Sequence, residues 1–219
     1  MKILHPLNVL FALLTSLSGC TKADGPTPDG DRSCLEKQEV PVSAHSINAR
    51  EKATADQLFA ANGIDKRNFR YTGYLREELK TYYPPYATFD EQVVRVEEYT
   101  NGLRIFTGQL NFLFRNGAFN FRAGSASGGT SLDATPSGTP ESIGVVFRAA
   151  LNEYGGPGSQ PCVVVEFGYY NLNAGTSNAS ERLVKAWKAS LKGSEYPFAY
   201  FEDKEGKLIY YDNGIRTFR

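Results

Sequence analysis

The sequence has few of the residues on which most catalytic and metal sites depend. Its 219 residues include 2 histidines, 3 cysteines, 1 tryptophan and 1 methionine. A zinc site needs three or four nitrogen, sulfur or oxygen ligands at suitable spacing, which so few histidines and cysteines cannot supply. Serine and cysteine nucleophiles need a positioned histidine or an equivalent base, and past the N-terminal segment the only histidine is His45. We therefore expect no enzyme, no metal, no cofactor and no small-molecule substrate.

An excess of charge of one sign is also missing. The 24 basic and 24 acidic side chains give a formal net charge of zero, so the basic surface of a nucleic-acid-binding protein is absent. The hydrophobic content of 41% and the aromatic content of 13% are those of a globular chain with enough material for a core.

The N-terminus carries a short apolar stretch rather than a membrane span. Residues 7–17 follow Lys2 and fall short of the roughly 20 apolar residues that a spanning helix needs, so they indicate a signal peptide. The stretch ends in Leu17-Ser18-Gly19-Cys20, which resembles the lipobox of bacterial lipoproteins. The resemblance implies that residues 1–19 are removed, that Cys20 carries palmitate-type acyl chains, and that the protein is anchored in the cell envelope. By the sorting rules of the lipoproteins that the sequence resembles, Thr21 in place of Asp implies the outer rather than the inner membrane. An ordinary signal peptide with a chance cysteine is the alternative.

The two remaining cysteines, Cys34 and Cys162, are predicted to form a disulfide, because an exported protein meets an oxidising compartment. The alternative is two unpaired thiols, with Cys162 buried as a small apolar residue. Residues 21–33 are rich in Pro, Gly and Asp and cannot bury apolar surface. We therefore expect a flexible, lipid-anchored tether over residues 20–45.

The rest of the chain predicts an α+β fold made of two related units, each a helix packed on a small antiparallel meander sheet. The first unit spans residues 46–123, a Gly/Ser-rich connector spans 124–138, and the second unit spans 139–219. Asn101-Gly102 and Asn116-Gly117 are predicted hairpin turns, and Thr139 and Pro140 mark a helix start. The predicted helices are 46–63 and 140–154, and the predicted strands include 69–79, 92–99, 103–114, 118–122, 162–170, 197–202 and 207–211.

Two segments resemble a known family. Residues 94–114 resemble the propeptide segment of fungalysin and thermolysin precursors, in a match carried by Tyr99, Asn101, Gly102, Ile105, Phe106, Gly108 and Leu110. Residues 183–215 resemble the PepSY domain that follows in those propeptides, through Ala186-Trp187, Ala199-Tyr200-Phe201, Gly206-Lys207-Leu208 and Asp212-Asn213-Gly214-Ile215. In that family the propeptide restrains a zinc protease and helps it to fold. This sequence has no His-Glu-x-x-His motif, so the resemblance implies a separate protease or other envelope protein as partner.

Tyr82, Tyr83 and Tyr86 surround Pro84-Pro85 and form the candidate partner-binding residues. Rigid aromatic side chains on a loop can bind protein or stack on carbohydrate; the alternative is that they fold back over the sheet edge. The adjacent carboxylates Glu77-Glu78, Glu97-Glu98 and Glu202-Asp203 point to opposite faces of a strand or lie in turns, so we expect them to be solvated.

These observations predict a non-enzymatic, lipid-anchored envelope protein that binds another protein, with inhibition or chaperoning of an envelope protease as the leading hypothesis. A scaffold lipoprotein and a carbohydrate-binding lipoprotein are the alternatives.

Overall fold

The computed structural model describes residues 34–39, 47–124, 126–127, 131–155, 162–176 and 179–215. The predicted signal peptide, the predicted acylation site Cys20 and the candidate histidine His45 lie outside these residues. Among the residues that are described, no helix has the length and hydrophobicity needed to cross a membrane.

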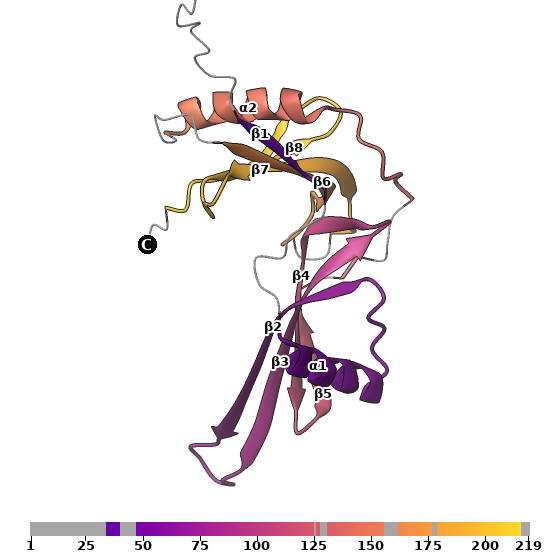
Figure 1. The fold of residues 1–219 in the computed structure, drawn as a ribbon. Coiled ribbons are helices and arrows are strands. Elements are labelled where there is room, and N and C mark those ends of the chain that lie inside the picture. The colour runs from indigo at the N-terminus through magenta and orange to yellow at the C-terminus, as the bar shows by residue number, and fades with distance from the viewer. Residues whose placement is uncertain are drawn as a thin grey trace, which may run out of the picture. The chain divides into compact units, whose positions relative to one another are not determined.

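Within the described residues the chain forms two helices and nine strands (Figure 1). The helices are α1 (Ala49–Ala61) and α2 (Pro140–Glu153). The strands are β1 (Leu35–Gln38), β2 (Phe69–Lys80), β3 (Thr88–Thr100), β4 (Leu103–Arg115), β5 (Ala118–Ala123), β6 (Val163–Asn171), β7 (Leu183–Leu191), β8 (Phe198–Glu202) and β9 (Leu208–Asp212).

All nine strands belong to one mixed sheet. The order is β2-β3-β4-β6-β7-β8-β9, with β1 also paired to β6 and β5 to β4. Strand β4 connects what the sequence predicted as two separate sheets, because it pairs antiparallel with β3 and β5 and parallel with β6, where Ile105 lies opposite Tyr169. The expected pair of α+β units, each a helix on a small antiparallel meander, is therefore wrong: the fold is one sheet-dominated structure.

Close packing at Gly168 allows β4 to reach β6. A Cβ atom at this position would lie 2.5 Å from the Arg104 carbonyl oxygen and 2.9 Å from Phe106 Cζ. Only glycine admits this approach without displacing backbone. The connection depends on a contact between distant residues, which strand periodicity in the sequence cannot show.

Strand β1 lies inside the segment predicted as a flexible tether. Its four residues pair in parallel with β6, from Leu35 opposite Val163 to Gln38 opposite Glu166. The Val163 amide also donates to the Cys34 carbonyl oxygen at 2.8 Å. The folded structure therefore begins about ten residues before the end of the predicted tether.

Each helix packs on its own hydrophobic cluster. Helix α1 buries Ala55, Leu58 and Phe59 against β2, β3 and β4, where the Phe59 ring lies 4.8 Å from that of Phe112. Because Phe59 is fully buried, Phe59→Ala is expected to cost about 3–5 kcal/mol. Helix α2 covers one face of β6, β7 and β8, and its cluster centres on residues such as Phe147 and Trp187 (Figure 1).

The predicted helix start and hairpin turns are confirmed. Thr139 caps α2 through its side-chain oxygen, which accepts from the Ser142 amide at 3.2 Å, and Pro140 occupies the first turn. Both hairpin turns place Asn and Gly at positive φ, at 51° and 78° for Asn101-Gly102 and at 52° and 79° for Asn116-Gly117. Two consecutive positive φ angles are what a tight turn between right-twisted strands requires.

Candidate functional site

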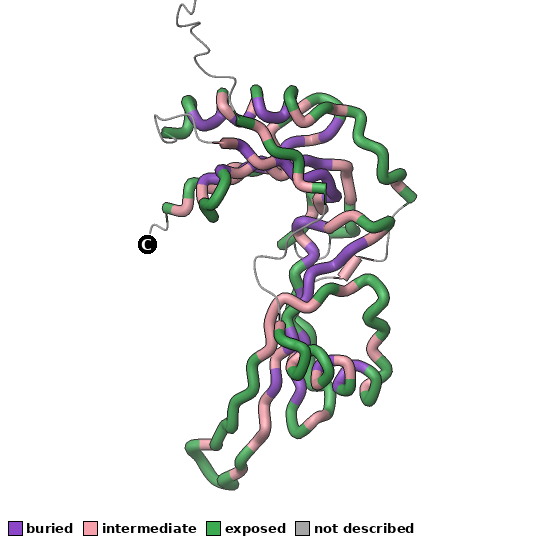
Figure 2. Tube along the Cα trace, in the orientation of Figure 1, coloured by how far each residue is buried: buried purple, intermediate pink, exposed green. Residues whose placement is uncertain are grey.

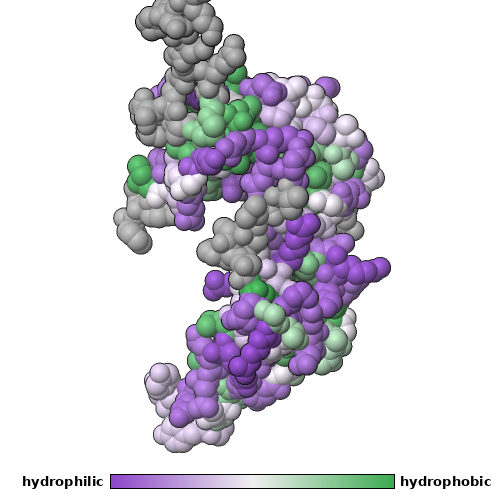
Figure 3. Space-filling model, in the orientation of Figure 1, coloured by the Kyte–Doolittle hydropathy of each residue, from purple (hydrophilic) through white to green (hydrophobic). Residues whose placement is uncertain are grey.

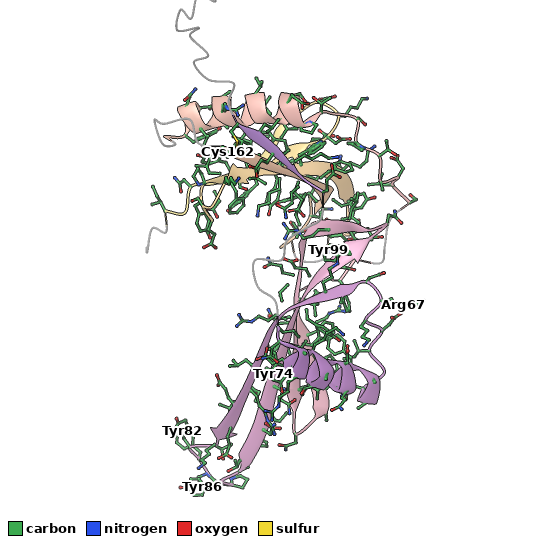
Figure 4. All side chains as sticks on the ribbon, viewed as in Figure 1. Arg67, Tyr74, Tyr82, Tyr86, Tyr99 and Cys162 are labelled. Atoms are coloured by element: carbon green, nitrogen blue, oxygen red, sulfur yellow. A yellow bond between two sulfur atoms is a disulfide. The ribbon has the colours of Figure 1, made fainter. Side chains whose placement is uncertain are left out.

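The free end of the β2–β3 hairpin carries the three tyrosines that the sequence singled out. Tyr82 is 90% exposed, Tyr83 83% and Tyr86 76%. Figure 4 shows Tyr82 and Tyr86 at the end of the hairpin, and Figure 2 shows this end as exposed. The alternative that these rings fold back over the sheet edge does not match the structure. We call residues 81–87 the tyrosine tip.

Hydrogen bonds from one residue close the tyrosine tip. The Thr81 side-chain oxygen accepts from the Ala87 amide at 2.8 Å and lies 3.0 Å from the Pro85 carbonyl oxygen, to which it donates. The Thr81 amide donates to the Ala87 carbonyl oxygen at 2.9 Å. Each ring of Pro84-Pro85 fixes its own φ angle. The tip is therefore a closed loop with few accessible backbone conformations. Less conformational entropy is then lost when it binds a partner.

The stem of the hairpin fixes the tip to the sheet. Strands β2 and β3 pair from Phe69 opposite Glu98 to Lys80 opposite Thr88. Across them, Arg76 makes two bonds to the Asp90 carboxylate, from Nε at 2.8 Å and from Nη2 at 3.1 Å. The Arg76 guanidinium holds the pKa of Asp90 below its usual range.

The tip differs in chemistry from its stem. Residues 81–87 (TYYPPYA) contain no charged side chain, whereas Glu77, Glu78, Asp90 and Glu91 lie beside them on the two strands. In Figure 3 the tip has the pale colours of intermediate hydropathy, next to strongly hydrophilic residues. Tyrosine combines a large rigid ring with a hydroxyl group that donates and accepts hydrogen bonds. The arrangement can therefore insert uncharged aromatic surface into a partner, beside a stem whose Glu78 and Asp90 are paired with Lys80 and Arg76.

The predicted disulfide is confirmed. Cys34 and Cys162 are bonded, with Cα atoms 4.4 Å apart, and they tie the start of β1 to the start of β6 across 128 positions of sequence. Glu36 lies beside these two sulfurs. Since both cysteines are oxidised, this cluster does not offer thiolate ligands.

Glu97 and Glu98 are buried rather than solvated, which corrects the sequence prediction. Glu97 is 8% exposed and Glu98 3%. The Glu98 carboxylate accepts from the Ser127 amide at 2.7 Å, and burial raises its pKa. Glu98 and Glu181 both line a cavity of about 210 Å³ between β4 and the residues that follow β6. The pattern of two adjacent carboxylates gave no sign of this, because each is covered by residues of another part of the fold: Glu97 by Arg104 of β4, and Glu98 by the segment that contains Ser127.

An ion network lies where β4 meets β6. The Arg104 guanidinium contacts Glu97 at 3.1 Å and Glu166 at 2.7 Å, and all three side chains are at most 11% exposed. Burial raises the pKa of Glu166 despite the nearby arginine. Arg104 Nε and Glu166 Oε1 are buried without a hydrogen-bond partner among the described residues. Sequence reasoning missed this network, because its members come from three strands.

Asp203 was also misread, as ordinary turn charge. It is 2% exposed and accepts from Trp187 Nε1 at 2.8 Å, from the Ser137 amide at 2.7 Å and from the Gly138 amide at 3.0 Å. Burial alone would raise its pKa, but these hydrogen bonds hold the pKa of the carboxyl below its usual value. The residue anchors the connector before α2 to the β8–β9 turn, which is a structural role.

The remaining paired carboxylates do not form a catalytic dyad with one another. Glu77 and Glu78 are exposed on the hairpin stem, and Glu202 is half-buried beside Asp203. The histidines, on which most acid–base chemistry near neutral pH depends, lie outside the described residues.

No protein-family model matches the sequence, and no curated protein matches it either.

Proposed function

We propose that this protein is a lipid-anchored envelope protein that binds a protein partner through the tyrosine tip. One observation carries the proposal: three tyrosines between 76% and 90% exposed, gathered in seven uncharged residues around two prolines. Exposed aromatic side chains held on a rigid support are typical of the residues that dominate binding energy at protein interfaces.

The anchor and the location belong to the same proposal. They are supported by Leu17-Ser18-Gly19-Cys20 at the end of a short apolar stretch and by the disulfide, which is typical of exported proteins. In this proposal, acyl chains on Cys20 attach the protein to the membrane. Loss of radiolabelled palmitate from a Cys20→Ala variant tests this part separately.

A protease is the partner class that we put first. The support is the resemblance of residues 94–114 and 183–215 to propeptide and PepSY segments, which act on proteases in that family. The proposed role is inhibition or chaperoning of a separate envelope enzyme, without catalysis by this chain.

A comparative pull-down from envelope extract tests the proposed function. Wild-type protein is compared with a Tyr82→Ser/Tyr83→Ser/Tyr86→Ser variant and with Tyr154→Ser, a control that alters a tyrosine 45% exposed at the end of α2. We expect one protein to be recovered with wild type and the control but at least tenfold less with the tip variant. A purified protease recovered in this way should lose activity on titration with wild type. Equal recovery with all three proteins would contradict the proposal.

A further inference from the structure

The face of the sheet opposite α2 is not covered by a helix among the described residues (Figure 1). Residues that lie opposite one another on neighbouring strands form one row across this face. The row is Gln38, Glu166, Lys188, Tyr200 and Tyr210. Alternation along the strands places Tyr170 and Phe198 on the same side. Figure 4 shows side chains projecting from this face of β6–β9, away from α2.

Aromatic rings form a continuous surface on this face. The Tyr200 ring lies 4.9 Å from that of Tyr170, 5.6 Å from that of Phe198 and 6.4 Å from that of Tyr210. Tyr210 is 43% exposed, and the other three are partly exposed. The Phe106 ring, seated over Gly168, extends the surface at 5.1 Å from Tyr200. We call Tyr170, Phe198, Tyr200 and Tyr210 the aromatic face.

A half-buried cation accompanies these rings. Lys188 lies in register between Glu166 and Tyr200, with its ammonium 5.2 Å from the Phe198 ring centre. It forms no ion pair with a carboxylate in the described part of the chain, and burial lowers its pKa. The Lys188 ammonium is the charged group of this face that a ligand can reach, because Glu166 is 4% exposed and its Oε1 is buried. A desolvated cation beside aromatic rings calls for a ligand that combines hydrogen-bond acceptors with apolar faces.

We propose that the aromatic face binds an oligosaccharide. The apolar C–H faces of pyranose rings would stack on Tyr200 and Tyr210. The sugar hydroxyl groups would accept from the Lys188 ammonium, which lies beside the Phe198 ring. This site is distinct from the tyrosine tip and does not depend on the proposed protein partner.

A protein or peptide fits the aromatic face less well. Strands β6, β7 and β8 are each paired on both sides, so among β6–β9 an extended peptide could be added as a strand only at the edge of β9, beside the aromatic face and not over its rings. A mainly apolar protein surface placed over the rings would leave the Lys188 ammonium without an acceptor, which costs binding free energy. Hydroxyl-rich ligands avoid that cost because each hydroxyl donates and accepts.

Isothermal titration of the full protein with cellohexaose, chitohexaose, maltohexaose and xylohexaose tests the inference. The protein is kept in a detergent without a sugar headgroup, so that the detergent cannot occupy the site. The variants are Tyr210→Ala, Lys188→Met and the Tyr82→Ser/Tyr83→Ser/Tyr86→Ser tip variant. The matched control is Tyr154→Ala, whose ring stacks on Tyr211 at 4.9 Å. Tyr210 and Tyr154 are similarly exposed, at 43% and 45%, so neither change should unfold the chain.

We expect at least one hexasaccharide to bind and each variant of the aromatic face to weaken it at least tenfold. The Tyr154→Ala control should stay within twofold of wild type. Three results would overturn the inference: no binding of any of the four sugars, equal binding by the Tyr210→Ala and Lys188→Met variants, or a loss seen only with the tip variant. The last result would move the glycan to the tyrosine tip. Retained glycan binding by the tip variant separates this inference from the proposed function.

Discussion

Trp187 Nε1 donates to Asp203 Oδ1 at 2.8 Å, and both residues are at most 2% exposed. The same carboxylate accepts from the Ser137 and Gly138 amides. A Cβ atom at Gly138 would lie 2.8 Å from the Asp203 carbonyl oxygen, so the connector passes close to the turn. One carboxylate therefore holds the core tryptophan, the connector and the start of α2 in place.

Asp203→Ala is expected to lower the free energy of unfolding by about 3 kcal/mol, because it leaves a buried indole N–H and two amides without an acceptor. Trp187→Phe removes one of those donors. A double-mutant cycle with Asp203→Ala and Trp187→Phe should give a coupling of about 1 kcal/mol in urea unfolding. Additive effects of the two changes would show that the bond contributes nothing.

Asp203 should contribute to the loss of stability at acid pH, together with other carboxyl groups of lowered pKa such as Asp56. The pKa of Asp203 in the folded state is lowered, so its contribution is fully present above the unfolded value of about 3.9 and is lost as pH falls through the folded pKa. Asp203→Asn should flatten the loss of stability between pH 4 and pH 2, measured by urea unfolding at each pH. An unchanged slope in the variant would contradict the assignment.

Arg104→Met should be among the most damaging single changes in the sheet. It leaves Glu97 and Glu166 buried without their cation, for which about 3–5 kcal/mol is typical. Because burial already raises the pKa of Glu166, protonation at acid pH should restore part of the loss. The control Arg67→Met alters an exposed pair with Asp65 and should leave the melting temperature nearly unchanged. Equal melting temperatures for the two variants would refute the structural role of the network.

The Cys34–Cys162 disulfide should stabilise the fold by about 5 kcal/mol in the chain-entropy treatment, given its long loop. The Cys34→Ser/Cys162→Ser variant should melt at lower temperature. Hydrogen exchange should be faster at the Val163 amide, which bonds to Cys34, and slow at the Phe201 amide in β8. Unchanged exchange at Val163 would show that β1 stays in place without the bond.

Local features of this protein were readable from its sequence, and long-range ones were not. Asn101-Gly102 and Thr139-Pro140 act through their own backbone angles and neighbouring amides, so their roles follow from residue type. Strand β1 has only four residues, LEKQ, and no alternation that marks it as a strand; it forms because β6 offers a free edge. The β4–β6 contact that merges the sheets depends on Gly168 meeting residues more than 60 positions earlier.

The candidate sites also divide into those that depend on local sequence and those that depend on long-range contacts. The tyrosine tip was visible because three tyrosines and two prolines occupy five consecutive positions. Asp203 and the Arg104 network could not be predicted, because their partners come from other parts of the chain. In the sequence, a buried charged residue looks the same as an exposed one. The aromatic face also needs the register of four strands before its tyrosines can be seen as one surface.

Site-specific photo-crosslinking in living cells tests the central claim most directly. A photoreactive phenylalanine analogue replaces Tyr83 at the tip or, as a control of similar chemistry, Tyr154 at the end of α2. The account predicts a discrete crosslinked protein from position 83 that is absent from position 154, identified by mass spectrometry as an envelope protein. The same products from both positions, or none from position 83 in correctly folded and expressed protein, would contradict a partner-binding tip.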